Sequence, residues 1–263
     1  MPLLIAVTLV CPVGRAGEMT ALLDCAADDK LLDTRFVRFG PGAKKGILRD
    51  GLGVRFKLPP SKDSGHTGIY SYVSLAGDFE ITAKFSWAGI RMPKAGYGAS
   101  AGLTVDTDGP AGSVSLARAN RPVTGGCFAL IRGKPGKTGN MVYENSQEPT
   151  KAPTGRFCLR REKNELICLA AEGEKDDLRE LKRFPFTDAT VKQVRVFADP
   201  AGSDDELDAR VFELRVMAEE ITVGVPERDK PQSWGWWPYL IGACVVVGGF
   251  VVWRRRRARD EEA

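Results

Sequence analysis

Residues 77–87, GDFEITAKFSW, decide the fold of this 263-residue chain because their side chains alternate strictly. Polar or charged residues occupy every second position, and the positions between them are apolar. The apolar positions are Phe79, Ile81, Ala83, Phe85 and Trp87. A period of two is typical of a strand with one face in a core and the other in water. The stretch therefore predicts a strand in a sheet that is buried on one side.

Three further stretches have the same period. Their expected inward positions are Val54, Phe56 and Leu58; Val194 and Val196; and Phe212, Leu214 and Val216. Clusters of Gly, Pro, Asn and Asp separate the short runs, as turns do. Only residues 20–32 have a plausible helical period. The pattern predicts an all-β chain, an antiparallel two-sheet sandwich of the jelly-roll kind.

The charge balance argues against a nucleic-acid partner. Residues 17–233 carry 32 Lys and Arg against 31 Asp and Glu, so the region is almost neutral. Nucleic-acid binding needs a concentrated basic face, which this composition does not supply. About two hundred residues between two hydrophobic ends fit one sandwich domain rather than two.

The C-terminal region predicts a membrane span. Residues 237–253 contain no charged side chain, and counted from Trp234 the run is long enough to cross a bilayer as a helix. Interfacial aromatic residues stand at both ends, and basic residues, which stay in the cytoplasm, follow at once. The predicted anchor residues are Trp234, Trp237, Trp253, Arg254, Arg255, Arg256 and Arg257. We expect a single-pass protein with its C-terminus inside and its large domain outside the cytoplasm, in a bacterial cell envelope.

The N-terminus predicts a secretory signal, since residues 3–13 are apolar and small residues follow. Cleavage is expected after Ala16 or after Ala27. The resulting plan is a signal within residues 1–27, an N-terminal segment at 28–47 and the sandwich at 48–225. A linker at 226–233, a membrane helix at 234–253 and a tail at 254–263 complete it.

Two cysteines lie in an expected hairpin, residues 155–173. A turn at residues 162–164 places Cys158 opposite Cys168, and in an exported domain this spacing invites a disulfide. The alternative is a register shifted by one residue, which leaves two reduced cysteines in the core. The sequence leaves both possibilities open.

The succession of GDFEITAKFSW, the Arg-rich hairpin and the stretch RFPFTDATVKQVRVFADPAGSDDELDARVFELRVMAEEI resembles a domain-of-unknown-function family of exported planctomycete proteins. The resemblance covers residues 48–221. It implies a concanavalin A-like lectin/glucanase (LamG-like) sandwich, and it brings no established activity with it.

That fold raises the question of glycoside hydrolysis. Retaining enzymes of this kind carry two glutamates about 5.5 Å apart with an aspartate between them. Glu174, Asp176 and Glu180 match the longer spacing of that motif. Their neighbours are charged rather than apolar, so we expect a polar turn between strands instead of a catalytic strand.

Metal chemistry has little support in the sequence. His66 is the only histidine, which excludes a multi-histidine site within one chain. Asp106 and Asp108 offer oxygen ligands to calcium, which needs six or more of them, but Asp and Gly are also ordinary turn residues. We therefore expect no cofactor, with calcium at these two aspartates as the alternative.

Binding needs only exposed aromatic rings and hydrogen-bonding groups. The candidates are Tyr97, which is flanked by glycine, and Tyr70 and Tyr72, which share one face of a strand. The favoured function is a noncatalytic module that binds a glycan or an envelope component. The alternatives are an assembly protein that binds another protein, and a hydrolase that uses Glu174 and Glu180.

Overall fold

The computed structural model describes ten segments of the chain: residues 19–23, 36–61, 65–71, 73–88, 93–94, 97–107, 112–136, 140–174, 177–201 and 203–223. They form fifteen strands and a single-turn helix, α2 (Ala43–Gly46). Their strand pairing is antiparallel throughout, apart from one isolated bridge. The predicted all-β sandwich is confirmed.

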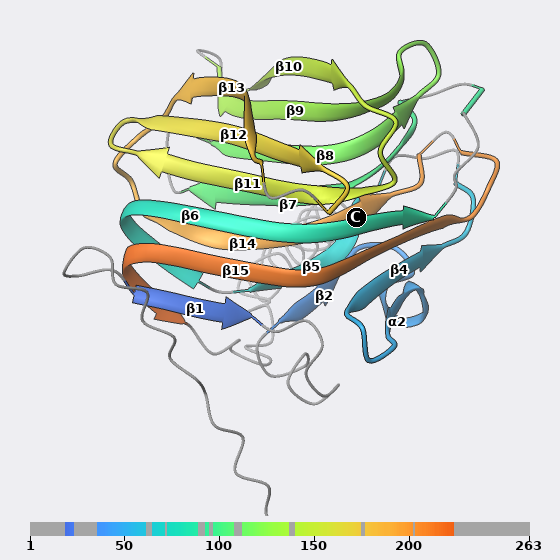
Figure 1. Cartoon of the computed structure of the whole chain (residues 1–263), viewed down its shortest axis with the longest axis horizontal. Helices are drawn as coiled ribbons and strands as arrows, with labels where there is room; N and C mark the ends of the chain where they lie inside the picture. The colour runs from blue at the N-terminus through green and yellow to red at the C-terminus, as the bar shows by residue number, and fades with distance from the viewer. Residues whose placement is uncertain are drawn as a thin grey trace, which may run out of the picture. The chain divides into compact units, whose positions relative to one another are not determined.

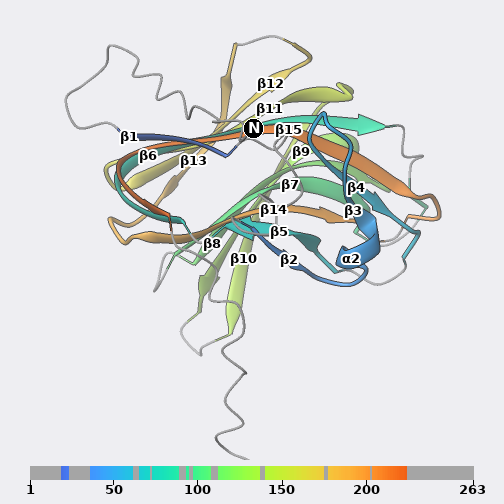
Figure 2. The same ribbon diagram turned by 90° about the horizontal axis from the view of Figure 1, so that it is seen from below.

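The strands form two layers, which Figure 2 shows one above the other. We call the layer that contains β7 the first sheet. In spatial order it consists of β2 (Val37–Phe39), β5 (Thr67–Ser71), β14 (Val191–Asp199), β7 (Ala99–Thr107), β8 (Ser113–Arg121), β9 (Gly125–Pro135) and β10 (Met141–Pro149). β10 is its edge, because among the described strands it pairs only with β9.

The second sheet lies across the core. In spatial order it consists of β13 (Arg179–Pro185), β12 (Glu165–Glu172), β11 (Thr154–Glu162), β6 (Val73–Ala88), β15 (Leu207–Val223), β4 (Val54–Leu58) and β3 (Ile47–Arg49). β1 (Met19–Leu23) also pairs with β15. The long strands β6 and β15 lie side by side through the middle of this layer (Figure 1). The two sheets are linked where Val191 pairs with Leu75.

The core between the sheets follows from the alternation in the sequence. All five predicted inward residues of β6 are buried, and Trp87 is 5% exposed. They pack in one cluster with residues of the first sheet such as Leu103, Leu116 and Phe128. Each side chain of this size stabilises the fold by roughly 1.5–3 kcal/mol when it leaves water. The predictions for β4 and β14 are confirmed in the same way.

The structure corrects the prediction for Phe212. A bulge between Val211 and Glu213 shifts the register of β15 against β6. Val211 is therefore buried, whereas Phe212 is only partly buried. An extra residue in one strand reverses the alternation on one side of it, which a regular period cannot anticipate.

The N-terminal boundary also needs correction. Residues 28–47 were expected to precede the sandwich, but β2 pairs with β5 and α2 contacts β4. The stretch 20–32 has a plausible helical period, yet its described part, residues 20–23, belongs to strand β1. Cleavage after Ala27 would remove β1, whereas cleavage after Ala16 would retain it. The sandwich thus begins before Leu48.

Candidate functional site

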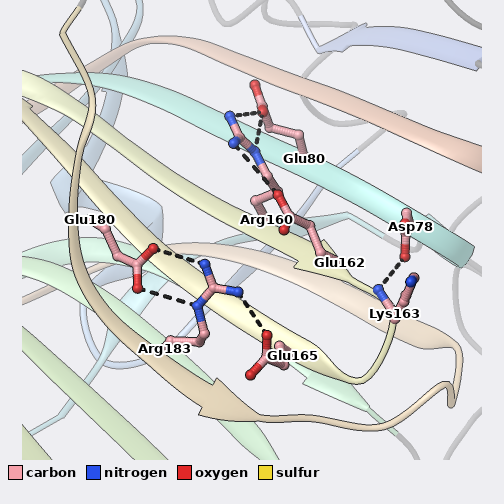
Figure 3. A network of polar contacts seen from close by, with 8 residues as sticks. All are labelled: Asp78, Glu80, Arg160, Glu162, Lys163, Glu165, Glu180 and Arg183. Atoms are coloured by element: carbon pink, nitrogen blue, oxygen red, sulfur yellow. Dashed lines mark hydrogen bonds and ion pairs between the residues drawn. The ribbon is translucent and has the colours of Figure 1, made fainter.

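The acidic motif does not form a pair of catalytic carboxylates. Glu174 is exposed in the turn after β12, and Asp176 lies outside the described residues. Glu180 lies on β13, where Arg183 donates hydrogen bonds to both of its carboxylate oxygens, at 3.3 and 3.0 Å. Arg183 also contacts Glu165 at 2.7 Å (Figure 3). These bonds hold the pKa of Glu180 below its usual value, whereas a catalytic acid needs a raised pKa.

Glu174 lines a cavity of about 240 Å³ on the second sheet. The other lining residues are Lys84, Phe85, Gly155, Arg156, Gly173 and Phe212. No second carboxylate is among them, so this cavity cannot supply the acid and the nucleophile of a retaining hydrolase.

The structure decides between the two predicted states of the hairpin cysteines. The turn consists of Lys163 and Asn164 alone, because Glu162 pairs directly with Glu165. Cys158 therefore lies opposite Leu169 rather than Cys168, and both cysteines are free. The predicted disulfide is wrong, and the register shifted by one residue is the one observed.

The candidate calcium ligands are not brought together. The Asp106 carboxylate forms an ion pair with Arg195, with 2.7 Å between Oδ2 and Nε. Burial nevertheless raises the pKa of Asp106, in opposition to Arg195. Asp108 lies outside the described residues. Within the described part of the chain, no three His, Cys, Asp or Glu side chains converge on a possible metal position.

Aromatic, amide and hydroxyl side chains gather on one face of the first sheet, the face that points away from the core. We call it the outer face. Its register aligns four rows of side chains across the strands. From β14 or β2 towards β10 these rows are Asp199, Ser100, Ala119, Cys127 and Pro149; Phe39, Gly68, Phe197, Gly102, Ala117, Ala129 and Gln147; Val37, Tyr70, Arg195, Thr104, Ser115, Ile131 and Asn145; and Gln193, Asp106, Ser113, Gly133 and Tyr143.

The centre of the outer face consists of short side chains. Gly102, Ala117 and Ala129 are adjacent in one row, and the two alanines are 4% and 2% exposed. In the next row the hydroxyl groups of Thr104 and Ser115 are 2.8 Å apart and hydrogen-bond to each other. Taller side chains stand on both sides of this centre.

On one side of the centre lies an aromatic and charged group. The rings of Phe39 and Tyr70 are 5.9 Å apart, and the guanidinium of Arg195 lies 6.0 Å from the Phe39 centroid. Tyr70, a predicted ligand-binding residue, is a partly buried tyrosine of β5 that points away from the core. Tyr72, its predicted companion, lies outside the described residues.

His66 belongs to the same side. Its ring stacks on Phe197 with 4.1 Å between centroids, and its Nε2 lies 3.8 Å from the Asp199 carboxylate. Burial lowers the pKa of His66, and Asp199 opposes that shift. This stack could not be predicted from the sequence, because His66 and Phe197 lie far apart in the chain.

On the other side, the β10 margin is open to solvent. Tyr143, Asn145 and Gln147 alternate along β10, and all three are exposed, Tyr143 by 61%. The Gln147 amide oxygen accepts a hydrogen bond from the Thr124 hydroxyl at 2.7 Å. This margin could not be identified from the sequence, because every residue of the stretch YENSQ is polar or amphipathic and no apolar alternation marks it.

Tyr97 lies apart from both groups. It is 76% exposed just before β7, and its backbone oxygen accepts a hydrogen bond from Arg121 at the end of β8. The register places Tyr143 near the opposite end of these strands, beside Gly133 and Ser113. The structure therefore does not join Tyr97 and Tyr143 in one platform.

The predicted membrane anchor, Trp234 to Arg257, lies outside the described residues. Of the predicted signal within residues 1–27, only residues 19–23 are described. Within the described segments, α2 is too short to span a bilayer, and no other helix meets the length and hydropathy that a span requires.

Comparison with solved structures supports the fold. The chain is similar to a legume lectin-like domain from Entamoeba histolytica, with a TM-score of 0.53 and 12% identity over 74% of this chain and 95% of that one. The exoplasmic/lumenal domain of VIP36, bound to Ca²⁺ and Man2, has a TM-score of 0.48 and 10% identity over 80% and 97%. The Crh5 transglycosylase in complex with NAG has a TM-score of 0.48 and 15% identity over 78% and 85%.

The sandwich thus resembles legume lectin-like folds, as the sequence resemblance implied. A search of curated proteins finds no match. A family model described as the C domain of a protein of unknown function, DUF1583, matches residues 17–232, and the chain belongs to that family.

Proposed function

We propose that this protein is a noncatalytic module that binds a glycan through the outer face of the first sheet. The proposal includes export of the sandwich and its retention at the membrane by residues 234–253. The observation that carries it is the outer face itself, where aromatic and amide side chains flank a centre of short residues. A few polar groups set among aromatic and apolar ones are typical of ligand sites.

Two further observations support binding over hydrolysis. Glu180 is held by Arg183, and the cavity beside Glu174 contains no second carboxylate. The similarity to a domain described as legume lectin-like supports the same choice.

The test is binding of the full-length protein, purified in detergent, to a panel of immobilised polysaccharides with calcium or with chelator. Release of reducing ends from each bound polysaccharide is measured in parallel. We expect saturable binding without release. Release that disappears in Glu174→Gln or Glu180→Gln would instead establish a hydrolase.

Substitutions on β10 test whether the glycan binds at the outer face. Asn145→Ala combined with Gln147→Ala removes two exposed amides and should weaken binding about tenfold, since each hydrogen bond contributes about 0.5–1.5 kcal/mol. Ser146→Ala is the matched control, because Ser146 lies between them on β10 and points to the other face. Equal binding by both variants would place the site elsewhere on the molecule.

A further inference from the structure

The Tyr143 side chain lies beside a glycine of the neighbouring strand. It lies directly opposite Gly133 in the β9–β10 pairing. A Cβ atom on Gly133 would lie 3.1 Å from Cε1 of Tyr143 and 3.2 Å from Cε of Met141. The tyrosine ring edge, the Met141 methyl group and the Ser113 hydroxyl, whose oxygen would lie 3.1 Å away, therefore border the space over the bare glycine backbone.

Much of the Tyr143 side chain remains accessible to solvent. It is 61% exposed, although its Cε1 atom lies near the position that a Gly133 Cβ would occupy. A tyrosine has few rotatable bonds, so a ring that rests on the backbone loses little conformational entropy when a ligand stacks on it. An exposed tyrosine ring at the edge of the sheet is accessible to a ligand that stacks on it.

The two strands that carry Tyr143 and its neighbours present no charged side chain on the outer face. On the outer face, β9 presents Cys127, Ala129, Ile131, Gly133 and Pro135, and β10 presents Met141, Tyr143, Asn145, Gln147 and Pro149. The charged residues of these two strands have the opposite parity, as in the pair formed by Lys134 and Glu144. The charged side chains of the outer face come from other strands, with Asp106 on β7, Arg195 on β14 and Arg121 at the far end of β8, close to Cys127.

We propose that Tyr143 is the stacking platform of a subsite for a neutral polysaccharide, with Asn145 and Gln147 as its hydrogen-bonding groups. The proposal rests on the proposed function and names its ligand class. A pyranose ring has an apolar C–H face that suits an aromatic ring, and its hydroxyl groups suit amides. From Tyr143 to Gln147 the strand extends roughly 13 Å, which suits a chain of sugars better than a single ring.

The test compares four forms of the full-length protein on neutral and on acidic polysaccharides. Tyr143→Ala should weaken binding to the neutral polymer about tenfold, whereas Tyr143→Phe should retain it, because stacking needs the ring and not the hydroxyl. Tyr97→Ala is the matched control, since it removes another exposed tyrosine at a distant position of the same sheet. All variants should share the Tm of the wild type.

The possible failures are distinguishable. Wild-type binding that Tyr143→Ala leaves unchanged would overturn the platform and leave the proposed function standing. Absence of binding to every polysaccharide would overturn both. Equal loss in Tyr143→Phe and Tyr143→Ala, or preference for acidic polymers, would overturn stacking on a neutral sugar. A change in sedimentation of Tyr143→Ala without a change in sugar binding would identify the β10 edge as a protein contact instead.

Discussion

Cys158 and Cys168 lie on opposite faces of the second sheet, although their hairpin brings their strands into direct contact. Cys168 packs in the main core between the sheets. Cys158 packs with Ile167 and Leu169 on the other side of the same strands. Burial raises the pKa of both thiols, that of Cys168 to about 12, so neither forms a thiolate at neutral pH.

We therefore expect both cysteines to be reduced and slow to react. In the native protein, iodoacetamide should leave Cys158 and Cys168 unmodified, because alkylation needs an accessible thiolate. After denaturation without reductant, both should be modified completely. Peptide mass spectrometry measures both states, and a peptide pair that is crosslinked between these cysteines would contradict the observed register.

Substitution of the buried Arg161 on β11 should destabilise the fold more than substitution of an exposed arginine on the same sheet. The Arg161 side chain is 2% exposed, and it donates hydrogen bonds to the backbone oxygens of Gly77, Thr187 and Ala189, the last at 2.7 Å. Its guanidinium also lies 4.9 Å from the ring centroid of Phe79. Arg161→Met leaves these buried acceptors without donors and should lower the free energy of unfolding by about 3 kcal/mol.

The matched control for Arg161 is Arg183 on the same sheet. Arg183 contacts Glu180 and Glu165, but these pairs are exposed (Figure 3). Exposed ion pairs contribute little because water and salt screen them. Urea denaturation should therefore separate Arg161→Met clearly from Arg183→Ala, and equal losses would show that the buried acceptors are satisfied in another way.

The inward face of the long strand β6 could be predicted because burial on one side imposes a period of two. Trp87 shows this, since its position in GDFEITAKFSW alone indicated a core residue. Phe212 could not be placed, because a bulge is a local irregularity that depends on the neighbouring strand. A single residue also determines the register of the two cysteines. Lys163 adopts a φ of 56°, which makes a two-residue turn possible and places Cys158 opposite Leu169.

The outer face was harder to predict because its rows join residues far apart in the chain. Tyr70, Arg195 and Thr104 are neighbours only through the spatial order of β5, β14 and β7. The buried role of Arg161 likewise depends on carbonyl groups of Gly77 and Ala189. From the sequence, an arginine in an alternating stretch is expected to face solvent, because acceptors from distant parts of the chain are not visible there.

Acid should weaken the fold partly through Asp208. Arg55 holds its carboxylate with Nε–Oδ1 and Nη2–Oδ2 distances of 2.8 and 2.5 Å. The hydrogen bonds from Arg55 lower the pKa of Asp208 below its unfolded value of 3.8. The stabilisation is thus present above pH 3.8 and is lost as the pH falls through the lower folded pKa.

Asp208→Asn removes that titration. Thermal melts of wild type and variant between about pH 5 and about pH 2 should show the wild-type advantage shrinking as the pH falls. Curves with a constant difference would mean that the pair does not respond to pH, and the lowered pKa would then be wrong.

Asp106 should respond with the opposite sign. Burial raises its pKa above the unfolded value of 3.8, even though Arg195 is close. The folded state therefore binds the proton more tightly, and its contribution is present below pH 3.8 and lost as the pH rises through the folded pKa. Relative to Asp106→Asn, the wild type should lose stability with rising pH in this window. Urea denaturation at several pH values measures it, and a gain with rising pH would reverse the assignment.

The centre of the outer face requires glycine at position 102. A Cβ atom there would lie 2.6 Å from the Cβ of Ala117 and would also clash with the backbone oxygen of Leu116. Because backbone atoms cannot rotate away, Gly102→Ala should force strands β7 and β8 apart and lower the free energy of unfolding by about 1–3 kcal/mol. Gly65→Ala is the control, since its new Cβ would meet Pro41 at an ordinary 3.5 Å. Urea denaturation should show a loss for Gly102→Ala and almost none for Gly65→Ala. If Gly102→Ala is as stable as the wild type, β7 and β8 can separate freely, and the four aligned rows of the outer face do not form a rigid surface.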